Sequence, residues 1–392
     1  MKNDQQHQQS VSLSHPMISQ KFKLVFTFAA TALAFTLVLY MKDYVSLSVD
    51  FVSSNLDAFH NLRRRHYTPP PPALHLTPKQ VPIEHLEDEE LLRRASTQLG
   101  NNGSLALASD NNNVIPKVAF LFLSRQGLGL RLLWEMFFEG NEGLFSIYVH
   151  SNTSYNGTVP ENSVFHGRRI TSKAVKWGEF SMVEAERRLL ANALLDPSNK
   201  RFILLSETTI PLYNFTTIYN YLTNSSETFV EVYDLPTAAG RGRYKYHMMS
   251  PTVTLKQWRK GSQWFEIDRD LALQVVTDHK YFPVFSKSCE RRRCCADEHY
   301  LPTFVHILAP DRNSDRTVTW ADWSMHGAHP SNFSGEQVTE GFLNLLRTGT
   351  KCEYNGEETN LCFLFARKFM HYKFGQNMRQ SKTTANSLQN HQ

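Results

Sequence analysis

Two kinds of hydrophobic pattern follow one another through the middle of the chain. Short continuous apolar runs are typical of strands that are buried on both faces of a parallel sheet. We predict such strands at residues 118–124, 145–150, 163–170, 201–207 and 228–234. Longer amphipathic segments predict helices at residues 129–139 and 181–195. Strands that alternate with helices indicate an α/β fold, with a mixed, mainly parallel sheet flanked by helices.

An earlier apolar segment has a different character. Residues 24–41 carry no charge and are long enough to cross a bilayer as a helix. Lys21 and Lys23 precede this segment closely, which favours a cytoplasmic N-terminus. A cleaved signal peptide is the alternative, but the segment starts late and has no clear small-residue cleavage site after Tyr40. We therefore predict a transmembrane signal-anchor that follows a cytoplasmic tail at residues 1–23.

The segment between this anchor and the first strand differs in composition from both. Residues 42–113 contain a proline run at 69–72 and an acidic stretch at 84–90. Prolines favour an extended conformation, and charge runs are usually solvated, so we predict a stem that holds a domain away from the membrane. The folded domain is predicted at residues 114–376, and a polar, disordered tail at 377–392.

Glycosylation sequons support the same topology. Asparagines in N-x-S/T tripeptides occur at Asn102, Asn152, Asn156, Asn214, Asn224 and Asn332. All of them follow the predicted anchor, where a lumenal domain would place them. We predict that the domain is lumenal and that these asparagines are N-glycosylation sites.

Charge and cysteine content exclude some classes of protein. The net charge is +5, and no nucleic-acid-binding module accompanies the dispersed basic residues, so nucleic acid is not an expected partner. Five cysteines occur without a CxxC pair and without histidines at zinc-finger spacing, which argues against structural zinc. One or two disulfides with one thiol left over are expected in an oxidising lumen. Their pairing stays open, and buried free cysteines are the alternative.

Common catalytic motifs are absent from the sequence or have a simpler structural explanation. The chain has no G-x-G-x-x-G fingerprint, no Walker loop and no G-x-S-x-G elbow. Asp268 and Asp270 fit the D-x-D pattern of metal-dependent sugar transferases, but they open a helical segment and are better explained as a helix N-terminus. Ser181 and Glu184 fit a capping box at another helix start.

Polar residues that follow the predicted strands are candidates for ligand binding. Ligands of open α/β sheets bind at the carboxyl edge of the strands. The residues at this edge are Arg125, His150, Ser206, Glu207 and Asp234. His150 is a candidate contact of the donor nucleotide, and a surface loop histidine is the alternative.

Two further segments carry candidate chemistry. Asp297 and Glu298 begin a helical apolar pattern, where a carboxylate could deprotonate an acceptor hydroxyl; a solvated helix start is the alternative. Arg367 and Lys368 end an apolar run, and two such cations could neutralise a leaving diphosphate without a metal. Without further evidence, Arg367 and Lys368 are simply basic residues at the end of a helix or strand.

Seven strings in a fixed order resemble the core-2/I-branching N-acetylglucosaminyltransferase family, glycosyltransferase family 14, and its plant branch closely. They lie at residues 175–207, 210–215, 240–244, 255–272, 297–303, 319–324 and 362–369. The resemblance implies a GT-A-like, Rossmann-related fold and an inverting transfer that needs no metal or other cofactor.

The resemblance also implies roles for individual residues. By its motifs, Glu298 is the catalytic base, Lys368 contacts the donor diphosphate, and Arg347 is the candidate companion arginine, with Arg367 beside them. The acceptor side is implied to include Trp320, Trp323, Arg243 and Lys245.

The expected protein is therefore a Golgi type II membrane glycosyltransferase. It would move N-acetylglucosamine, glucuronic acid or xylose from a UDP-sugar to a glycan or glycoprotein, and complexes with other Golgi transferases are expected partners. A catalytically inactive lumenal protein that binds glycans or serves as a scaffold is the alternative. Departures from the plant pattern at Thr208–Thr209, Leu235–Ala239 and Cys295 bear on substrate choice and on activity.

Overall fold

The structure is a computed structural model. It describes residues 80, 82–97, 115–289, 294–325 and 327–370. The predicted cytoplasmic tail, the anchor, the sequon at Asn102 and the C-terminal tail lie outside these ranges. Within them, no helix has the length and apolar character needed to cross a membrane.

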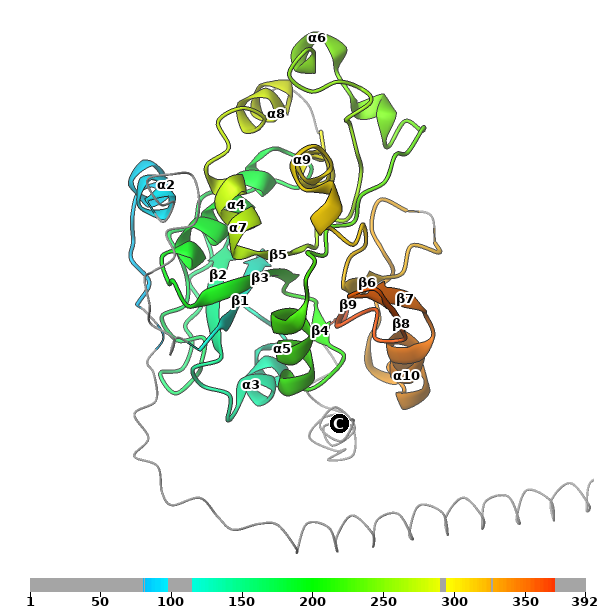
Figure 1. The fold of residues 1–392 in the computed structure, drawn as a ribbon. Helices are drawn as coiled ribbons and strands as arrows, with labels where there is room; N and C mark the ends of the chain where they lie inside the picture. Colours follow the sequence, from blue (N-terminus) through cyan, green and yellow to red (C-terminus); the bar gives the residue numbers. More distant parts are fainter. Residues whose placement is uncertain (1–79, 81, 98–114, 290–293, 326, 371–392) are drawn as a thin grey trace, which may run out of the picture. The chain divides into compact units, whose positions relative to one another are not determined.

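A four-stranded sheet in the order β2-β1-β3-β5 forms the centre of the domain (Figure 1). Its strands are β1 Lys117–Ser124, β2 Phe145–Ser151, β3 Asn199–Ser206 and β5 Glu266–Asp268. The first three are parallel, and β5 pairs with β3 antiparallel. The predicted mixed, mainly parallel sheet is confirmed.

Helices cover both faces of this sheet (Figure 1). The helices of the described residues, of which α4 and α7 cover one face and α3 and α5 the other, are α2 Asp88–Ser96, α3 Arg131–Phe138, α4 Ser181–Leu194, α5 Phe215–Asn224, α6 Tyr246–Met249, α7 Arg269–Val276, α8 Phe282–Cys289, α9 Tyr300–Leu308 and α10 Glu340–Thr348. Short 3₁₀ turns lie at η1 Arg241–Arg243, η2 Ala296–Glu298, η3 Pro310–Arg312 and η4 Gly335–Gln337. The predicted helices at residues 129–139 and 181–195 correspond to α3 and α4.

Strand β1 shows why its sequence reads as a continuous apolar run. Every residue of the strand is buried. Phe120 and Phe122 pack into the cluster that contains α3 and α5, whereas Leu121 belongs to the cluster that contains α4, α7 and α9. Because successive side chains of a strand point to opposite faces, burial on both faces leaves polar residues only at the two ends of β1, Lys117 and Ser124.

A second, smaller sheet carries the C-terminal strand. Its strands, in the order β4-β9-β6, are β4 Ile210–Pro211, β9 Phe365–Arg367 and β6 Thr319–Ala321. Strand β4 follows β3 after a short turn, so β9 lies close to the carboxyl end of β3. A separate hairpin is formed by β7 Cys352–Tyr354 and β8 Glu357–Thr359.

Two predicted strands are wrong. In the segment 163–170 only Arg169 makes a ladder contact, a single bridge to Val149, and turns occupy most of the rest. The segment 228–234 makes three isolated bridges to three different partner segments, so it forms no continuous ladder. Each segment buries a few apolar side chains against the domain, such as Phe165 and Val230, and a local pattern alone cannot distinguish such packing from strand pairing.

Of the two predicted helix starts, one is confirmed and the other is wrong. Asp268 caps α7, and its carboxylate accepts a hydrogen bond from the Leu271 amide at 2.8 Å, which confirms the helix N-terminus. The capping box at Ser181 and Glu184 is wrong. Phe180 precedes α4 without a side-chain cap, and the Ser181 hydroxyl accepts a hydrogen bond from the Lys176 amide instead.

The acidic stretch at residues 84–90 is only partly solvated. It leads into α2, whose Leu91 and Ala95 are buried in the main core. Asp88 forms ion pairs with Arg188 on α4 at 2.7 Å and with Lys173 at 2.8 Å. Part of the segment that we predicted as stem is therefore packed on the folded domain.

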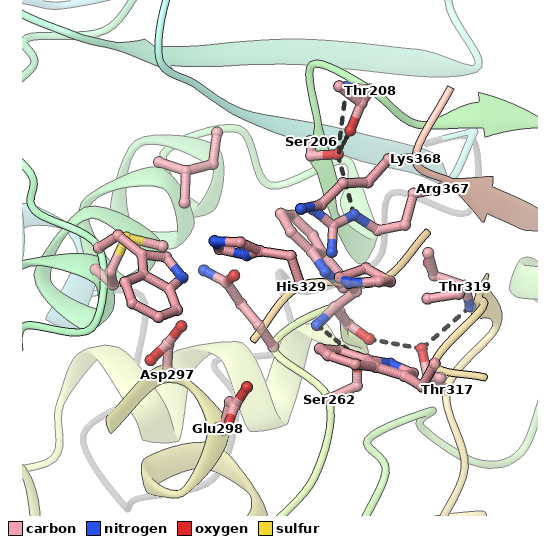
Figure 2. Close-up of a pocket in the computed structure, with 18 of the residues that line it drawn as sticks. Ser206, Thr208, Ser262, Asp297, Glu298, Thr317, Thr319, His329, Arg367 and Lys368 are labelled. Carbon is pink, nitrogen blue, oxygen red and sulfur yellow. Dashed lines mark hydrogen bonds between the residues drawn. The ribbon is translucent and has the colours of Figure 1, made fainter. Parts of the chain in front are cut away.

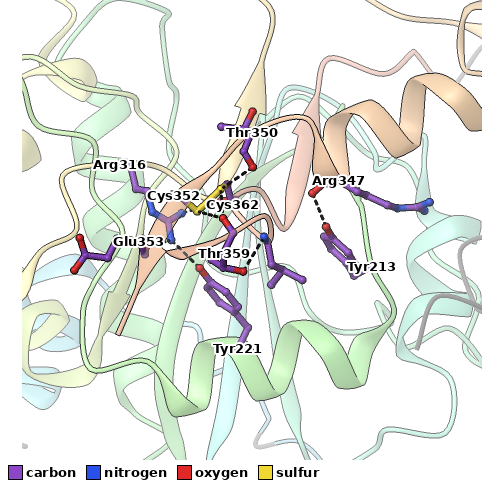
Figure 3. Close-up of a disulfide and its surroundings, with 10 residues drawn as sticks. Tyr213, Tyr221, Arg316, Arg347, Thr350, Cys352, Glu353, Thr359 and Cys362 are labelled. Carbon is purple, nitrogen blue, oxygen red and sulfur yellow. Dashed lines mark hydrogen bonds between the residues drawn. A yellow bond between two sulfur atoms is a disulfide. The ribbon is translucent and has the colours of Figure 1, made fainter. Parts of the chain in front are cut away.

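Disulfides connect Cys289 with Cys294 and Cys352 with Cys362, and Cys295 remains free. The expectation of one or two disulfides with one thiol left over is confirmed. Figure 3 shows the second disulfide at the β7–β8 hairpin, where Arg316 donates to the Cys362 carbonyl oxygen.

Candidate active site

A large pocket opens at the carboxyl edge of the central sheet (Figure 2). Its volume is about 1220 Å³. The ends of β1, β2 and β3 supply part of its lining through Arg125, His150, Ser206 and Glu207. Asp234, the fifth strand-end candidate, lies outside this lining and pairs with Arg241.

The turn η2 places two carboxyl groups in this pocket. Cys295 enters the turn with a left-handed backbone (φ 47°), and its amide donates to the Gly178 carbonyl. The Gly261 amide donates to the Glu298 carbonyl at 2.9 Å. A Cβ atom at Gly261 would lie 1.7 Å from the Glu231 carbonyl oxygen, so only glycine fits this approach.

Two cationic side chains lie beside the Glu298 carboxylate. Its Oε2 atom accepts hydrogen bonds from Arg243 at 2.8 Å and from Lys260 at 2.9 Å. Burial favours the neutral acid, but Lys260 and Arg243 outweigh burial, and the pKa of Glu298 lies below its ordinary value. Glu298 is therefore ionised at neutral pH.

The neighbouring Asp297 has the opposite character. It is almost fully buried, and its Oδ1 atom has no hydrogen-bond partner in the part of the chain that the structure describes. Burial and the negative charge of Glu298 raise the pKa of Asp297 to about 7. Adjacent carboxyl groups thus differ in their readiness to lose a proton, which is typical of functional sites.

Two further cations face these carboxyl groups across the pocket (Figure 2). The Arg367 guanidinium lies 4.2 Å from the Trp264 ring centroid, and its Nε donates to the Ser206 hydroxyl. Burial lowers the pKa of Arg367 to about 10. Burial and the nearby Arg367 and Arg125 charges lower the pKa of Lys368 to about 8. The Lys368 ammonium makes no ion pair with the described residues.

His150 is a buried histidine at the end of β2, not a surface loop residue. Its Nε2 accepts a hydrogen bond from the Lys173 amide at 3.2 Å. Burial and the charges of Arg188 and Arg169 lower the pKa of His150 to about 4. A neutral imidazole therefore lines this end of the pocket.

Aromatic residues form another part of the wall. Trp320 on β6 packs against Phe333 at 5.8 Å between ring centroids, and Trp323 is 49% exposed. Both lie in the pocket lining. Trp177 and His329 also contribute, with ring centroids 4.9 Å apart. Flat apolar rings of this kind suit stacking against sugar rings.

Two predicted site residues lie elsewhere. Arg347 on α10 is buried, and its Nε donates to the Leu212 carbonyl at 2.6 Å. Figure 3 shows its carbonyl accepting from the Tyr213 hydroxyl. Lys245 donates to the Ser288 carbonyl at 3.3 Å. Neither Arg347 nor Lys245 belongs to the pocket lining, whereas the other predicted donor and acceptor residues do.

The sequons within the described residues differ in setting. Asn152 and Asn332 are exposed residues of the pocket lining. Asn156 and Asn224 are exposed away from that lining. Asn214 caps α5, and its side-chain oxygen accepts from the Thr217 amide. Attachment of glycans at these positions stays a prediction.

Residues that depart from the plant pattern border the same pocket. Thr208, Ala239 and Cys295 all belong to its lining. The Thr208 hydroxyl lies 3.0 Å from the Ser206 hydroxyl, which also contacts Arg367. These substitutions therefore lie where substrates would bind.

Sequence reasoning missed several residues of the site. Lys260, Gln263 and Trp264 lie within the string 255–272, which carried the resemblance, yet none was assigned a role. Lys260 is 38 positions before Glu298 in the sequence, so no local pattern connects the two residues. Only the fold brings them together.

In the described part of the chain, no group of three or more histidine, cysteine, aspartate or glutamate side chains could hold a metal ion. The carboxylates of Asp268 and Asp270 form ion pairs with Arg312 at 2.9 and 2.8 Å.

An ionised carboxylate that faces two cations across a polar and aromatic pocket defines a class of enzyme. It is suited to a transferase in which a hydroxyl loses its proton while an anionic group departs. Comparison with known proteins identifies the family within this class: the profile of the Core-2/I-Branching enzyme family matches residues 118–347, and the chain belongs to this family. It is also 36% identical over 299 residues to a rice protein named glycosyltransferase BC10 (Oryza sativa subsp. japonica). That match covers 64% of this chain and 73% of the rice protein. The chain is a glycosyltransferase.

Proposed function

We propose that this glycosyltransferase transfers a sugar from a UDP-sugar with inversion and without a metal ion, on a GT-A-like domain. One observation carries the proposal: the ionised Glu298 and the cations Arg367 and Lys368 line opposite sides of one pocket. This arrangement supports a displacement in which the base and the leaving group act on opposite faces of the donor sugar.

The proposed reaction uses the residues in a fixed order. Glu298 takes the proton of the acceptor hydroxyl, and the hydroxyl oxygen bonds to the anomeric carbon of the donor sugar. The bond from this carbon to the diphosphate breaks, and its electron pair leaves with UDP. Lys368 and Arg367 stabilise the charge that develops on the diphosphate, as a divalent ion does in metal-dependent enzymes.

Other parts of the pocket support the binding of the two substrates. We propose that the neutral imidazole of His150 contacts the nucleotide, because it lies at the carboxyl edge of β2. Trp320 and Trp323 would stack on the acceptor, and Arg243 would contact it beside Glu298. The acceptor is a glycan or glycoprotein, and the donor belongs to the N-acetylglucosamine, glucuronic acid or xylose class.

We also propose a Golgi membrane setting, with the catalytic domain in the lumen. The apolar segment 24–41, the sequons after it and the two disulfides support this topology. Complexes with other Golgi transferases are compatible with it.

Glu298→Gln tests the proposed reaction. A glutamine keeps the shape of the side chain and one acceptor oxygen but cannot accept a proton, so turnover should fall by about 10²- to 10⁴-fold. Binding of UDP, measured by calorimetry, should stay within two-fold of wild type. Near-normal turnover would contradict the assignment of the base. Wild-type chain that UDP does not stabilise in a thermal-shift assay would favour the alternative of an inactive binding or scaffold protein.

A further inference from the structure

One carboxyl oxygen of Asp297, a residue in the wall of the active-site pocket, has no hydrogen-bond partner among the described residues. The residue is 7% exposed, and its Oδ1 accepts no hydrogen bond from residues 82–97, 115–289, 294–325 or 327–370. Figure 2 shows Asp297 on the same side of the pocket as Glu298, across from Arg367 and Lys368. A buried polar atom without a partner costs free energy, so such atoms are usually satisfied by water or by a ligand.

The nearby cations do not satisfy this oxygen. Lys260 and Arg243 both donate to Oε2 of Glu298. Among the described residues, Oδ1 of Asp297 therefore has no donor. In a pocket that binds sugars, the common donors are hydroxyl groups, and a carboxyl oxygen accepts hydrogen bonds from hydroxyls well.

A second acceptor lies near Asp297. The Gln263 side-chain nitrogen donates to Glu186 at 2.8 Å, and Glu186 is 5% exposed on α4. With its nitrogen engaged there, Gln263 retains its amide oxygen as an acceptor, and Gln263 belongs to the pocket lining. Burial and the charge of Asp297 raise the pKa of Glu186, so the two acidic residues influence each other.

The positions of these two acceptors identify the substrate that they would contact. Gln263 precedes Trp264, whose ring lies under the Arg367 guanidinium, and Asp297 precedes Glu298. A donor sugar is bonded to the diphosphate and must present its anomeric carbon to the acceptor hydroxyl that the base deprotonates. It must therefore lie between the cations and Glu298, where Asp297 and Gln263 line the pocket.

We propose that Asp297 and Gln263 form the subsite that binds hydroxyl groups of the donor sugar. This inference rests on the proposed UDP-sugar transfer and adds the residues that recognise the sugar itself. A subsite built from hydrogen-bond acceptors discriminates strongly, because a sugar without the matching hydroxyl leaves a buried acceptor unpaired. Discrimination between donors would then depend on these two side chains.

The test compares nucleotides with and without a sugar. Calorimetry would measure the Kd of UDP, UDP-N-acetylglucosamine, UDP-glucuronic acid and UDP-xylose with the full-length chain in detergent. For the UDP-sugar that wild type binds most tightly, Asp297→Ala should raise the Kd by about ten-fold, as expected for one lost hydrogen bond in a buried site. The Kd of UDP should change by less than two-fold. Asp311→Asn, at an exposed position outside the pocket, is the control.

Two more variants keep the test informative if Asp297→Ala does not fold. Asp297→Asn keeps the size of the side chain, and Gln263→Ala removes the second acceptor while leaving Asp297 in place. Each should weaken UDP-sugar binding more than UDP binding. Once the donor is known, either variant should raise the KM of the donor and leave the KM of the acceptor unchanged.

Several results would overturn the subsite. They are unchanged UDP-sugar binding in every variant, equal weakening of UDP and UDP-sugar, or a KM increase for the acceptor alone. A shift of the pH profile without any change in KM would mean that Asp297 acts only through the charge of Glu298. Wild-type chain that binds none of these nucleotides would overturn the proposed UDP-sugar transfer, and the subsite with it. Normal wild-type binding with no loss in the variants would overturn the subsite alone.

Discussion

The carboxylate of Glu298 accepts two charged hydrogen bonds on a single oxygen, from Lys260 and Arg243. A base held in this way is ionised over a wide pH range, and its orientation is fixed by its partners. Its other oxygen, Oε1, accepts no hydrogen bond from the described residues and is available to a substrate hydroxyl. The two cations thus lower the basicity of Glu298, but they keep its carboxylate ionised and hold it in one orientation.

Removing Lys260 should move the acid limb of the pH profile. Lys260→Met takes away a positive charge that lowers the pKa of Glu298, so this pKa should rise. Because the base acts only when deprotonated, the acid limb of kcat/KM should shift to higher pH. The ratio of kcat/KM at pH 8 to that at pH 5 should therefore increase in the variant. Lys256→Met, at an exposed position outside the pocket, should leave this ratio unchanged.

Lys368 predicts a second pH dependence, with the opposite sign. Its pKa is lowered to about 8, mainly by burial and by the nearby Arg367. As the pH rises through this value the ammonium loses its charge, so UDP binding should weaken above pH 8. Calorimetry at pH 7 and pH 9 would measure the change. Lys368→Arg should keep its charge at both values and flatten the dependence; an equally steep loss in that variant would exclude Lys368 as the cause.

At the scale of elements, the edge strand β5 is joined to β3 by a buried ion pair. Arg201 on β3 donates to both carboxylate oxygens of Glu266 on β5, at 2.7 and 2.6 Å. The Arg201 side chain is 7% exposed and the Glu266 side chain is fully buried. Two charges in this setting depend on each other, because neither has water to replace its partner.

Breaking this pair should be costly. Arg201→Met leaves the Glu266 carboxylate buried without its partner, and we expect the free energy of unfolding to fall by about 3–5 kcal/mol. Urea unfolding followed by circular dichroism would measure it. The matched control is the exposed pair Lys351–Glu358, whose side chains are 68% and 69% exposed. There, Lys351→Ala should cost less than about 1 kcal/mol. Similar losses in the two variants would contradict the role of burial.

The same scale shows what the sequence could predict of the fold. The strand at residues 118–124 was found because it is apolar from Val118 to Leu123, a pattern that follows from burial on both faces. The segment 228–234 has a similar pattern, yet its bridges go to three different segments. The segment with which a strand pairs depends on residues far away in the chain, so a local pattern cannot predict it. The acidic start of α2 was missed for the same reason, since its partner Arg188 lies 100 positions away.

For the site, the sequence predicted which side chains take part but not whether each of them is charged. Glu298 and Lys368 could be found because they lie in strings that resemble a known family. Their charge states depend on neighbours that the fold supplies, Lys260 for the base and Arg367 for the lysine. The burial of Asp297 could not be predicted from the sequence either, because it depends on the packing of η2 against α4 and not on the residues next to it in the chain.

At the scale of the whole molecule, the C-terminal segment completes the active site. Strand β9 carries Arg367 and lies between β4 and β6. Just before it, Cys362 forms a disulfide with Cys352 on β7 (Figure 3). The pocket therefore depends on a segment that is held both by strand pairing and by a covalent link.

We expect the disulfide to contribute stability rather than nucleotide affinity. Closing a loop with a sequence separation of 10 lowers the entropy of the unfolded chain and should be worth about 3 kcal/mol. Replacing Cys352 and Cys362 together by serine should therefore lower the Tm by roughly 5–10 °C. The Kd for UDP at 20 °C should stay within two-fold of wild type, because the pairing of β9 with β4 and β6 is independent of the disulfide.

The control for this prediction uses the remaining thiol. Cys295→Ser removes a cysteine that forms no disulfide, so it should change the Tm by much less than the double variant does. If the double variant instead lost UDP binding while retaining its Tm, the disulfide would position the cations Arg367 and Lys368 rather than stabilise the fold. In that case the covalent link, and not strand pairing, would hold β9 at the carboxyl end of β3.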